Sequence, residues 1–456
     1  MKVMKFGGAT IKDPKMMKDV GNIIQKEKGK KVVVVSALSG QTNEIREFIA
    51  QSRIKRHEVD EFIKKIWKRH TFMVKKTISD KTVLKDILET LNKHILRLER
   101  LLYGVVYTEE LTPRTKDLIL SFGERASAYI MEGMLLSKNV KAKAYEADLA
   151  GVVTDGIFLN ATADLIKTKE NLKKNILPGI QKGTIPVITG FFGCDSKGRT
   201  TTFGKNGSDY SAAVIANALN ADILELWKDV DGFMSANPSI IENAHTIQRL
   251  SYDEAAELAY FGIGLLHPRT VQPAREKDIP IVIKNILKPN KDGTTIEKTG
   301  FKTEKVIKSV VYSKDLIEIK VSGAGAGYRP GVLKEVTSTL GDSNINIYSV
   351  STSHTQLSLL IHKNDLSICN EALNGVQGGV IEHIDHLSDI ALVCVVGEGS
   401  RENRGLAGKI FSAVSKAGVN VEMISAGASS VASHFIIKRI DLKKTISAIH
   451  QTFCEK

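Results

Sequence analysis

The chain opens on Val3-Met4-Lys5-Phe6-Gly7-Gly8, an apolar stretch that ends in two glycines and carries a lysine just before them. A helical pattern follows from Met16 to Lys26, and after it comes Val32-Val33-Val34-Val35, an uninterrupted apolar run that ends at Ser36. Uninterrupted apolar residues, unlike an alternating pattern, indicate strands that are buried on both faces. Two such strands separated by a helix predict a parallel pair in an α/β sheet.

The same alternation continues along the first two thirds of the chain. Further strands are predicted at 185–190, 223–227 and 280–284. Helical patterns cover roughly 44–102 and 116–136, and others begin near Ser208 and Tyr252. We therefore predict an α/β fold in which helices sandwich a largely parallel sheet.

A turn-rich polar segment from Lys288 to Thr295 interrupts this pattern and predicts a domain boundary. Beyond it the sequence repeats itself, because Gly331-Val332-Leu333 is matched 74 positions later by Gly405-Leu406-Ala407. Such a repeat predicts a duplicated small α/β domain. We expect a large domain at 1–290, a linker at 291–305, and two small βαββαβ domains at 306–385 and 386–456.

Composition excludes several classes of protein. With 456 residues, 42% of them hydrophobic and 25% charged, the chain has the composition of a globular protein of about three domains. No apolar run reaches the ~20 residues of a membrane-spanning helix, and the N-terminus lacks a signal-peptide pattern, so we expect a cytoplasmic protein without a membrane partner. The four cysteines show no spacing typical of disulfides or zinc. The net charge of +13 is accompanied by no nucleic-acid-binding motif, so we expect no nucleic-acid partner.

Two glycine sites carry the candidate chemistry. Gly7 and Gly8 follow a buried strand, where their N–H groups can approach phosphate oxygens beside Lys5, although the same pair could be a plain turn. The second site, Gly204-Lys205-Asn206-Gly207-Ser208-Asp209, precedes a helical pattern. Ser208 or Asp209 could simply cap this helix, but a helix N-terminus beside glycines and a lysine also favours an anion. The sequence contains no P-loop and no protein-kinase motif.

Six motifs follow one another along the chain: Lys5-Phe6-Gly7-Gly8, Val35-Ser36-Ala37 with Thr42-Asn43, Ser121-Phe122-Gly123-Glu124-Arg125, Gly207-Ser208-Asp209-Tyr210, Asp229-Val230-Asp231-Gly232 and Leu266-His267-Pro268. Their order resembles that of aspartate kinases in the amino-acid kinase family, and the duplicated unit resembles a pair of ACT domains. The resemblance covers essentially the whole chain. It implies that 1–290 is a kinase domain that phosphorylates the β-carboxylate of L-aspartate with ATP and Mg²⁺. This reaction is the first step of lysine, threonine and methionine biosynthesis.

The resemblance also implies a role for individual residues. Lys5 would contact the transferring phosphoryl group beside Gly7 and Gly8, and Asp209 would hold Lys5 or help to organise magnesium. Glu124 would bind the substrate's ammonium group, although without the resemblance it would be taken for a surface residue of a helix. The remaining substrate-binding residues would be Ser36, Ala37, Thr42 and Lys205. The acceptor carboxylate is already ionised at pH 7, so no general base is expected, and catalysis needs mainly positioning and charge neutralisation.

The nucleotide side departs from the family's pattern. Lys228, Asp229 and Met234 are the ATP-binding residues that the resemblance implies there, but Lys228 replaces a common threonine and Met234 a usual tyrosine. Other family residues are also replaced: an arginine by Ser239, a lysine by Gly264, and an Arg-Gly pair by Lys205-Asn206. A lysine keeps the charge of an arginine but loses its two-pronged contact with a carboxylate. Lys228 could restore one lost phosphate contact.

The ACT-like repeats imply regulation by an end-product amino acid. By resemblance, the effector site would comprise Arg329, Gly331, Asn346, Tyr348 and Ser349. Lysine-sensitive relatives carry an acid where Tyr348 stands, which leaves threonine, lysine or another effector open. The alternative is that these domains merely dimerise, and in either case we expect a homodimer or a larger homo-oligomer.

Two other functions stay open at this point. One is another amino-acid kinase that acts on glutamate or a related carboxylate. The other is a catalytically weak amino-acid sensor in which the kinase domain is a scaffold. The replaced arginine and lysine on the nucleotide side favour the sensor, whereas Lys5 and Asp209 oppose it. The chain ends at Lys456, and we expect no attached dehydrogenase domain.

Overall fold

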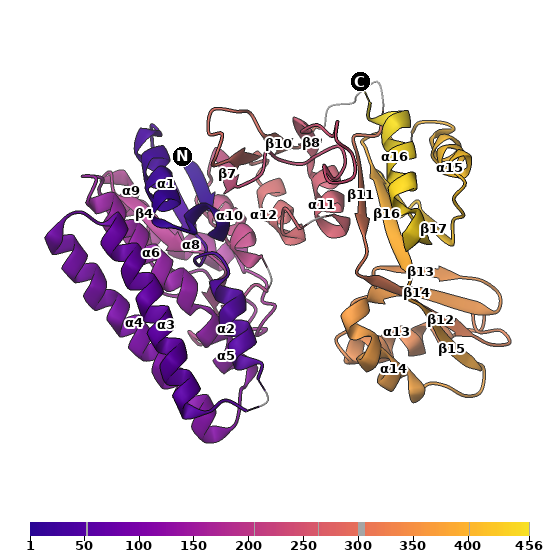
Figure 1. Cartoon of the computed structure of the whole chain (residues 1–456), viewed down its shortest axis with the longest axis horizontal. Helices are drawn as coiled ribbons and strands as arrows, with labels where there is room; N and C mark the ends of the chain where they lie inside the picture. Colours follow the sequence, from indigo (N-terminus) through magenta and orange to yellow (C-terminus); the bar gives the residue numbers. More distant parts are fainter. Residues whose placement is uncertain (52, 205, 263, 300–305, 401, 456) are drawn as a thin grey trace. The chain divides into compact units, whose positions relative to one another are not determined.

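A computed structural model describes residues 1–455, apart from 52, 205, 263, 300–305 and 401, and divides the chain into two compact units (Figure 1). The first unit comprises Met1–Phe233, Gln248–Tyr252 and Leu266–Thr299. The second comprises Met234–Ile247, Asp253–Leu265 and Gly300–Lys456. The sequence predicted a single boundary after residue 290, whereas here two short segments ahead of residue 266 join the second unit. They do so because they bond to its strands, as where the N–H of Val310 donates to the carbonyl of Ser235.

An eight-stranded sheet forms the centre of the first unit, in the order β3-β4-β2-β1-β7-β9-β10-β8. All neighbouring strands are parallel except the antiparallel pair β9–β10. The strands are β1 (Lys2–Phe6), β2 (Lys31–Val35), β3 (Ala142–Tyr145), β4 (Ile185–Thr189), β7 (Ile223–Lys228), β8 (Arg249–Ser251), β9 (Ile281–Asn285) and β10 (Thr294–Glu297). The predicted largely parallel sheet is therefore confirmed, with one antiparallel contact.

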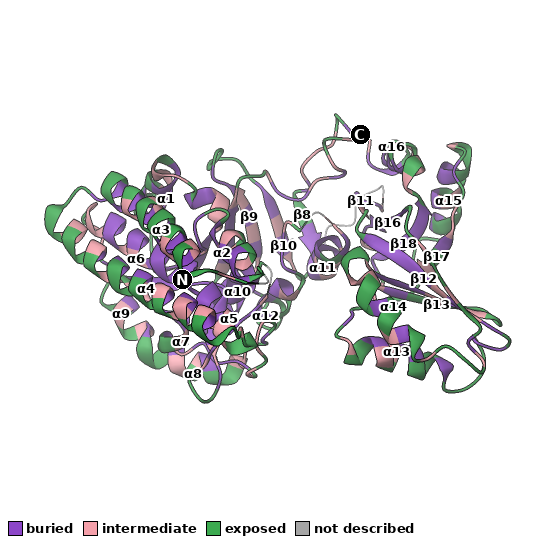
Figure 2. Cartoon of the chain, turned by 60° about the horizontal axis from the view of Figure 1, so that its bottom comes forward, coloured by how far each residue is buried: buried purple, intermediate pink, exposed green. Residues whose placement is uncertain are grey.

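The central strands are buried on both faces, because every residue of β2 and β4 is buried although successive side chains point to opposite sides. In Figure 2 buried residues are purple, and green exposed residues lie along helices such as α3 and α4. The longer helices are α1 (Pro14–Lys26), α2 (Gln41–Ile49), α3 (Arg56–Thr77), α4 (Lys81–Thr108), α5 (Pro113–Leu120), α6 (Phe122–Leu136), α8 (Leu165–Asn175) and α10 (Gly207–Ala218). The shorter elements are α7 (Ala147–Ala150), α9 (Leu177–Gln181), α12 (Val271–Arg275), the 3₁₀ helices η1 (Gly8–Ile11) and η2 (Pro268–Thr270), and the hairpin β5 (Phe192–Cys194) and β6 (Thr200–Thr202).

Helix α10 is the central helix of this unit. All of its residues are buried, and it packs against β1, β2 and β7 as well as α8 and α12. Small residues such as Ser211, Ala212 and Ala213 let it lie close to the sheet. Its first turn therefore lies beside the carboxyl ends of the central strands, the usual location of ligand sites in open α/β sheets.

The second unit contains two four-stranded sheets, as expected for two ACT-like domains. One sheet has the order β13-β14-β12-β15 and the other β11-β16-β18-β17. The strands are β11 (Ser309–Ser313), β12 (Leu316–Ser322), β13 (Ser349–Thr352), β14 (Gln356–His362), β15 (His383–Leu387), β16 (Ile390–Val396), β17 (Met423–Ala426) and β18 (Ala432–Lys438). The helices are α11 (Tyr252–Phe261), whose first residue belongs to the first unit, α13 (Val332–Asp342), α14 (Leu366–Asn374), α15 (Leu406–Lys416) and α16 (Leu442–Phe453).

The two small sheets are not simply consecutive in the sequence. β11, which opens the segment predicted as the first repeat, pairs with β16 in the second sheet. β15 pairs with β12 in the first sheet and extends across the predicted boundary between residues 385 and 386. The second sheet thus includes a strand from the segment assigned to the first domain, and β15 of the first sheet extends two residues beyond that segment.

Candidate active site

A buried carboxylate lies between two lysines at the carboxyl edge of the central sheet. Asp209, in the first turn of α10, places Oδ1 2.6 Å from Lys5 Nζ on β1. Lys228, the last residue of β7, donates a hydrogen bond from Nζ to Asp209 Oδ2 at 2.8 Å. Burial alone would raise the pKa of Asp209, but the charges of Lys228 and Lys5 outweigh it and hold the pKa below its usual range. Burial also lowers the pKa of Lys5, although the charge of Asp209 raises it in part. With both lysines protonated, the three side chains carry a net positive charge that suits an anionic ligand.

The backbone around Lys5 approaches closely to its neighbours. A Cβ on Gly8 would come within 2.9 Å of the carbonyl oxygen of Ala37, so the chain after β1 passes the chain after β2 at a distance that favours glycine. The N–H of Ser36 donates to the carbonyl of Phe6, which joins the same two strand ends. The predicted residues Gly7, Gly8, Ser36 and Ala37 thus lie together beside Lys5.

Glu124, in the first turn of α6, is the second buried carboxylate of this region. It is only 3% exposed, and among the described residues its Oε2 has no hydrogen-bond partner. Burial raises the pKa of Glu124 to about 8, although the N–H groups of Ala37 and of Glu124 itself, together with the charge of Lys5, lower it in part. A Cβ on Gly123 would lie 2.5 Å from that of Ala37, so the glycine lets α6 approach the end of β2. An unpaired buried carboxylate oxygen beside a lysine is suited to receive a cationic group.

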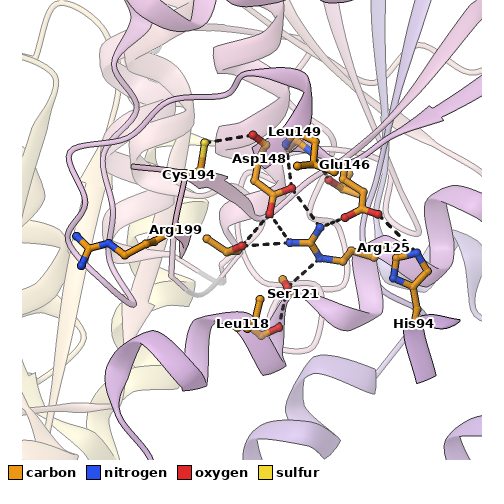
Figure 3. Close-up of polar contacts among 12 residues, drawn as sticks. His94, Leu118, Ser121, Arg125, Glu146, Asp148, Leu149, Cys194 and Arg199 are labelled. Carbon is orange, nitrogen blue, oxygen red and sulfur yellow. Dashed lines mark hydrogen bonds and ion pairs between the residues drawn. The ribbon is translucent and has the colours of Figure 1, made fainter. Parts of the chain in front are cut away.

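Arg125 anchors the helix that carries Glu124 (Figure 3). Its guanidinium forms ion pairs with Glu146 and Asp148 and donates hydrogen bonds to the hydroxyls of Ser121 and Thr200. The guanidinium also lies 4.4 Å from the ring centroid of Phe192. Glu146 also accepts a hydrogen bond from Tyr129 at 3.0 Å and lies 3.5 Å from the ring of His94. Burial lowers the pKa of His94 to about 4, so this ring is neutral at pH 7. Arg125 therefore joins α6 to β6 and to the turn after β3.

The remaining predicted residues belong to other segments of the chain. Thr42 lies half-buried on α2, and Asp229 is exposed directly after β7. Lys205 lies outside the described residues. Met234 belongs to the second unit, where its sulfur lies 3.6 Å from Thr246 Oγ1. No group of three or more His, Cys, Asp or Glu side chains suited to a metal ion occurs in the described part of the chain.

Part of the predicted effector site is assembled in the second unit. Asn346 donates a hydrogen bond from Nδ2 to the hydroxyl of Tyr260 at 3.2 Å, and the ring of Tyr348 lies 5.3 Å from that of Tyr260. Ser349 follows as the first residue of β13, with a buried Oγ that lacks a hydrogen-bond partner among the described residues. Arg329 and Gly331 lie in the exposed turn that leads into α13.

Comparison with known proteins identifies the family to which each part of the chain belongs. Residues 1–285 match the amino acid kinase family, and residues 311–374 and 393–453 each match an ACT domain family. Aspartokinase 1 of Arabidopsis thaliana, a chloroplastic protein, is 32% identical over 99% of this chain and 80% of its own length. The chain belongs to the aspartokinases. Aspartokinase III of E. coli, solved with lysine and aspartate, is 25% identical with a TM-score of 0.82 over the full length of both chains. The aspartate kinase of Clostridium acetobutylicum is 26% identical with a TM-score of 0.79 over 99% of this chain and 100% of its own.

As an aspartokinase the chain is a phosphotransferase. The sequence reasoning found Glu124 and Asp209 through their motifs but missed the partners of Arg125, because Glu146, Asp148 and Thr200 have no motif of their own. It also missed Tyr260, whose contacts with Asn346 and Tyr348 are not visible in the chain order. No helix of the described chain is long and apolar enough to cross a membrane.

Proposed function

We propose that this aspartokinase transfers the γ-phosphoryl group of ATP to the β-carboxylate of L-aspartate and so forms 4-phospho-L-aspartate, the first step toward lysine, threonine and methionine. The observation that carries the proposal is the pairing of two chemically different sites at one sheet edge. The Lys5–Asp209–Lys228 cluster is cationic, and one oxygen of the Glu124 carboxylate has no hydrogen-bond partner in the described part of the chain. An amino acid with a second carboxylate matches both, with its ammonium on Glu124 and its acceptor carboxylate toward Lys5.

In this reaction a carboxylate oxygen attacks the γ-phosphorus, a new O–P bond forms, and the bond to the leaving ADP oxygen breaks. No proton moves at the acceptor, because an aspartate side chain is already ionised at pH 7. Two anions must nevertheless meet, and charge builds up on the transferring group. Lys5 and Lys228 would neutralise that charge, with the N–H groups of Gly7 and Gly8 beside them. Asp209 keeps both ammonium groups in place.

The substrate's remaining contacts follow from the segments that surround Glu124. Ser36, Ala37, Thr42 and Lys205 would bind the carboxylates of aspartate, and Asp229 and Met234 would contact the nucleotide. Mg²⁺ would reach the site with the nucleotide phosphates, as it commonly does in kinases. Both oxygens of Asp209 already face lysines, so this carboxylate is not suited to hold the ion.

The ACT domains would supply feedback regulation. E. coli aspartokinase III has been solved with lysine bound, and the equivalent site here would contain Arg329, Gly331, Asn346, Tyr348 and Ser349. Because Tyr348 carries no negative charge to pair with a lysine ammonium, threonine stays a candidate effector beside lysine. We further propose a cytoplasmic homodimer, or a larger homo-oligomer, formed through the ACT domains.

A hydroxamate assay with ATP, magnesium and a panel of aspartate, glutamate and their analogues tests the proposal. Aspartate should be the best acceptor, and Lys5→Met should abolish turnover. Lys31→Met serves as a control, since Lys31 is also a buried lysine of the central sheet but donates to the carbonyls of Ile24 and Glu27 at the opposite strand end. Preference for glutamate would favour another carboxylate kinase. Equal background activity in the parent and in Lys5→Met would favour the amino-acid sensor.

A further inference from the structure

Arg269 stands outside every predicted role, although it directly follows the motif Leu266-His267-Pro268. It lies in the short helix η2, where its own N–H donates to Nδ1 of His267 at 3.1 Å. Burial lowers the pKa of His267 to about 4, so this neighbouring ring is uncharged at pH 7. The guanidinium of Arg269 points away from the short helix toward two loops of the same unit.

The guanidinium uses both terminal nitrogens to bind these loops. Nη1 donates to the carbonyl of Ala161 at 2.9 Å and to Thr162 Oγ1 at 3.4 Å. Nη2 donates to Asn160 Oδ1 at 3.0 Å and to the carbonyl of Phe203 at 2.6 Å. The four N–H groups of these two nitrogens thus have four acceptors, which is the full capacity of that end of an arginine.

These contacts bracket the segment that leads to Asp209. Phe203 immediately precedes Gly204, and Asp209 follows in the first turn of α10. On the far side of Asp209, the ring of Tyr210 lies 5.1 Å beneath the guanidinium carbon. The hydroxyl of Tyr210 accepts a hydrogen bond from the N–H of Ala163 at 3.2 Å, next to the residues 160–162 that Arg269 contacts. Arg269 therefore contacts the chain just before and just after the glycine-rich segment.

The backbone that Arg269 joins is conformationally strained. Leu159 has a φ of 68° and Phe191 a φ of 76°, values that bulky side chains rarely adopt. The carbonyl of Phe191 receives the N–H of Phe203, and a Cβ on Gly204 would lie 3.3 Å from the carbonyl of Leu159. Such strain persists only where surrounding contacts over-determine the conformation, and it gathers at functional sites.

We propose that Arg269 is a positioning residue of the phosphoryl transfer: through Phe203 and Tyr210, which flank Asp209 in the sequence, it sets Asp209, and through it Lys5, against the bound amino acid. It does not touch the substrate. Charge alone does not perform this role, because the two nitrogens must reach acceptors on two separate loops. A lysine has a single nitrogen and no planar fork, so it cannot replace the arginine.

Kinetics of Arg269→Ala and Arg269→Lys in the full chain test this inference. Both variants should lower kcat and raise the KM for aspartate, with a combined loss in kcat/KM on the order of 10²-fold, the usual effect of a displacement of about 1 Å near the reacting atoms. The dissociation constant for ADP, measured by calorimetry, should rise by less than tenfold, or about 1.4 kcal/mol, because both variants retain Lys228. Added guanidinium chloride, at a concentration below that which unfolds the protein, should restore part of the activity of Arg269→Ala but none to Arg269→Lys.

Arg439 offers a matched control in the second unit. It also donates hydrogen bonds to two backbone carbonyls, those of Lys314 and Ser388, both at 3.1 Å. Arg439→Ala should leave the kinetics without effector unchanged.

The inference is overturned if Arg269→Lys behaves like the parent. It is also overturned if the KM for aspartate and the dissociation constant for ADP rise together in step with a fall in the urea midpoint of unfolding. Failure of both Arg269 variants to fold would equally overturn it, because the arginine would then serve the fold rather than the reaction. The inference rests on the proposed function, but different results would overturn each. A parent protein that is inactive with aspartate would overturn the proposed function. An active parent with equally active Arg269 variants would overturn only the inference.

Discussion

Replacing Glu124 with glutamine should remove a specific part of the pH dependence of the first unit's stability. Burial raises the pKa of Glu124 to about 8 from an ordinary value of 4.5, and the nearby N–H groups and Lys5 offset this only partly. The folded protein therefore keeps a proton on Glu124 at pH 7, whereas the unfolded chain has lost it. Glutamine has the same shape but no proton to lose.

The sign of the effect follows from counting protons. Between about pH 4.5 and pH 8 the folded state binds one proton more than the unfolded state, so the free energy of unfolding falls as the pH rises through this window. The pKa difference of 3.5, from 4.5 to about 8, corresponds to about 5 kcal/mol at 1.36 kcal/mol per unit. Below the window both states are protonated, and above it both are ionised. Glu124→Gln should therefore gain stability over the parent steadily from pH 5 to pH 8.

Urea unfolding followed by tryptophan fluorescence measures this difference. The protein has two tryptophans, Trp67 and Trp227, and both lie in the first unit, so the signal reports that unit. Subtracting the parent's unfolding free energy from the variant's at each pH cancels the titrations that the two proteins share. Glu89→Gln is the control, because Glu89 is exposed on α4 and its replacement should leave the curve unchanged.

A difference between variant and parent that stays constant from pH 5 to pH 9 would refute the reasoning. It would mean that Lys5 keeps Glu124 ionised in the free protein despite its burial.

The ionisation of Glu124 should also be detectable when aspartate binds. Because Glu124 must ionise to pair with the substrate's ammonium, aspartate binding at pH 7 should release close to one proton, which calorimetry in buffers of different ionisation enthalpy can detect.

Three further outcomes are expected. Lys228→Thr should weaken ADP and ATP binding about 10- to 150-fold in calorimetry, since a charge-assisted contact contributes about 1.5–3 kcal/mol, while unchanged nucleotide affinity would exclude Lys228 from the phosphate site. Gly123→Ala should destabilise the first unit by about 1–3 kcal/mol and raise the KM for aspartate, because the new Cβ would meet Ala37; a variant as stable and active as the parent would show that α6 can move away freely. Burial raises the pKa of both the Cys194 and the Cys369 thiol to about 11, so these two thiols should react with Ellman's reagent at pH 8 only slowly until urea is added, and their rapid reaction in the native protein, read from Cys194→Ser and Cys369→Ser variants, would contradict this.

Local sequence was sufficient to predict five of the eight strands of the central sheet, β1, β2, β4, β7 and β9, but not the short strands β3, β8 and β10. The runs at 32–35 and 185–189 are continuously apolar, and such runs form strands buried on both faces wherever helices cover them, as they do here. The partner of a strand is decided at longer range. Nothing in 309–313 distinguishes a strand of the first repeat from one of the second, yet β11 pairs with β16, more than one domain further along the chain. Pattern can predict that such a strand exists but not which sheet receives it.

The candidate site shows the same division. Lys5 and Asp209 were predicted from motifs and lie in contact. Arg125 stood inside a motif, but its partners Glu146, Asp148 and Thr200 come from three segments that only the fold brings together. The burial of Glu124 was also out of reach, since a glutamate in the first turn of a helix is normally exposed. It becomes buried because Gly123 lets the helix approach the end of β2, a packing effect that composition and periodicity do not report.

The charges around the sheet edge explain why this site should prefer a small dicarboxylic amino acid to a simple dianion. In the free protein at pH 7, Lys5 and Lys228 are opposed by a single ionised carboxylate, Asp209, because the pKa of Glu124 lies at about 8 and its carboxyl group is mostly neutral. The edge thus has a positive charge that attracts phosphate and carboxylate groups. An incoming ammonium group then stabilises the ionised form of Glu124, so the negative charge that pairs with the substrate develops only when the substrate is present. A dianion without an ammonium group would leave Glu124 protonated and lose that contact, and succinate should therefore bind far more weakly than aspartate while releasing no proton.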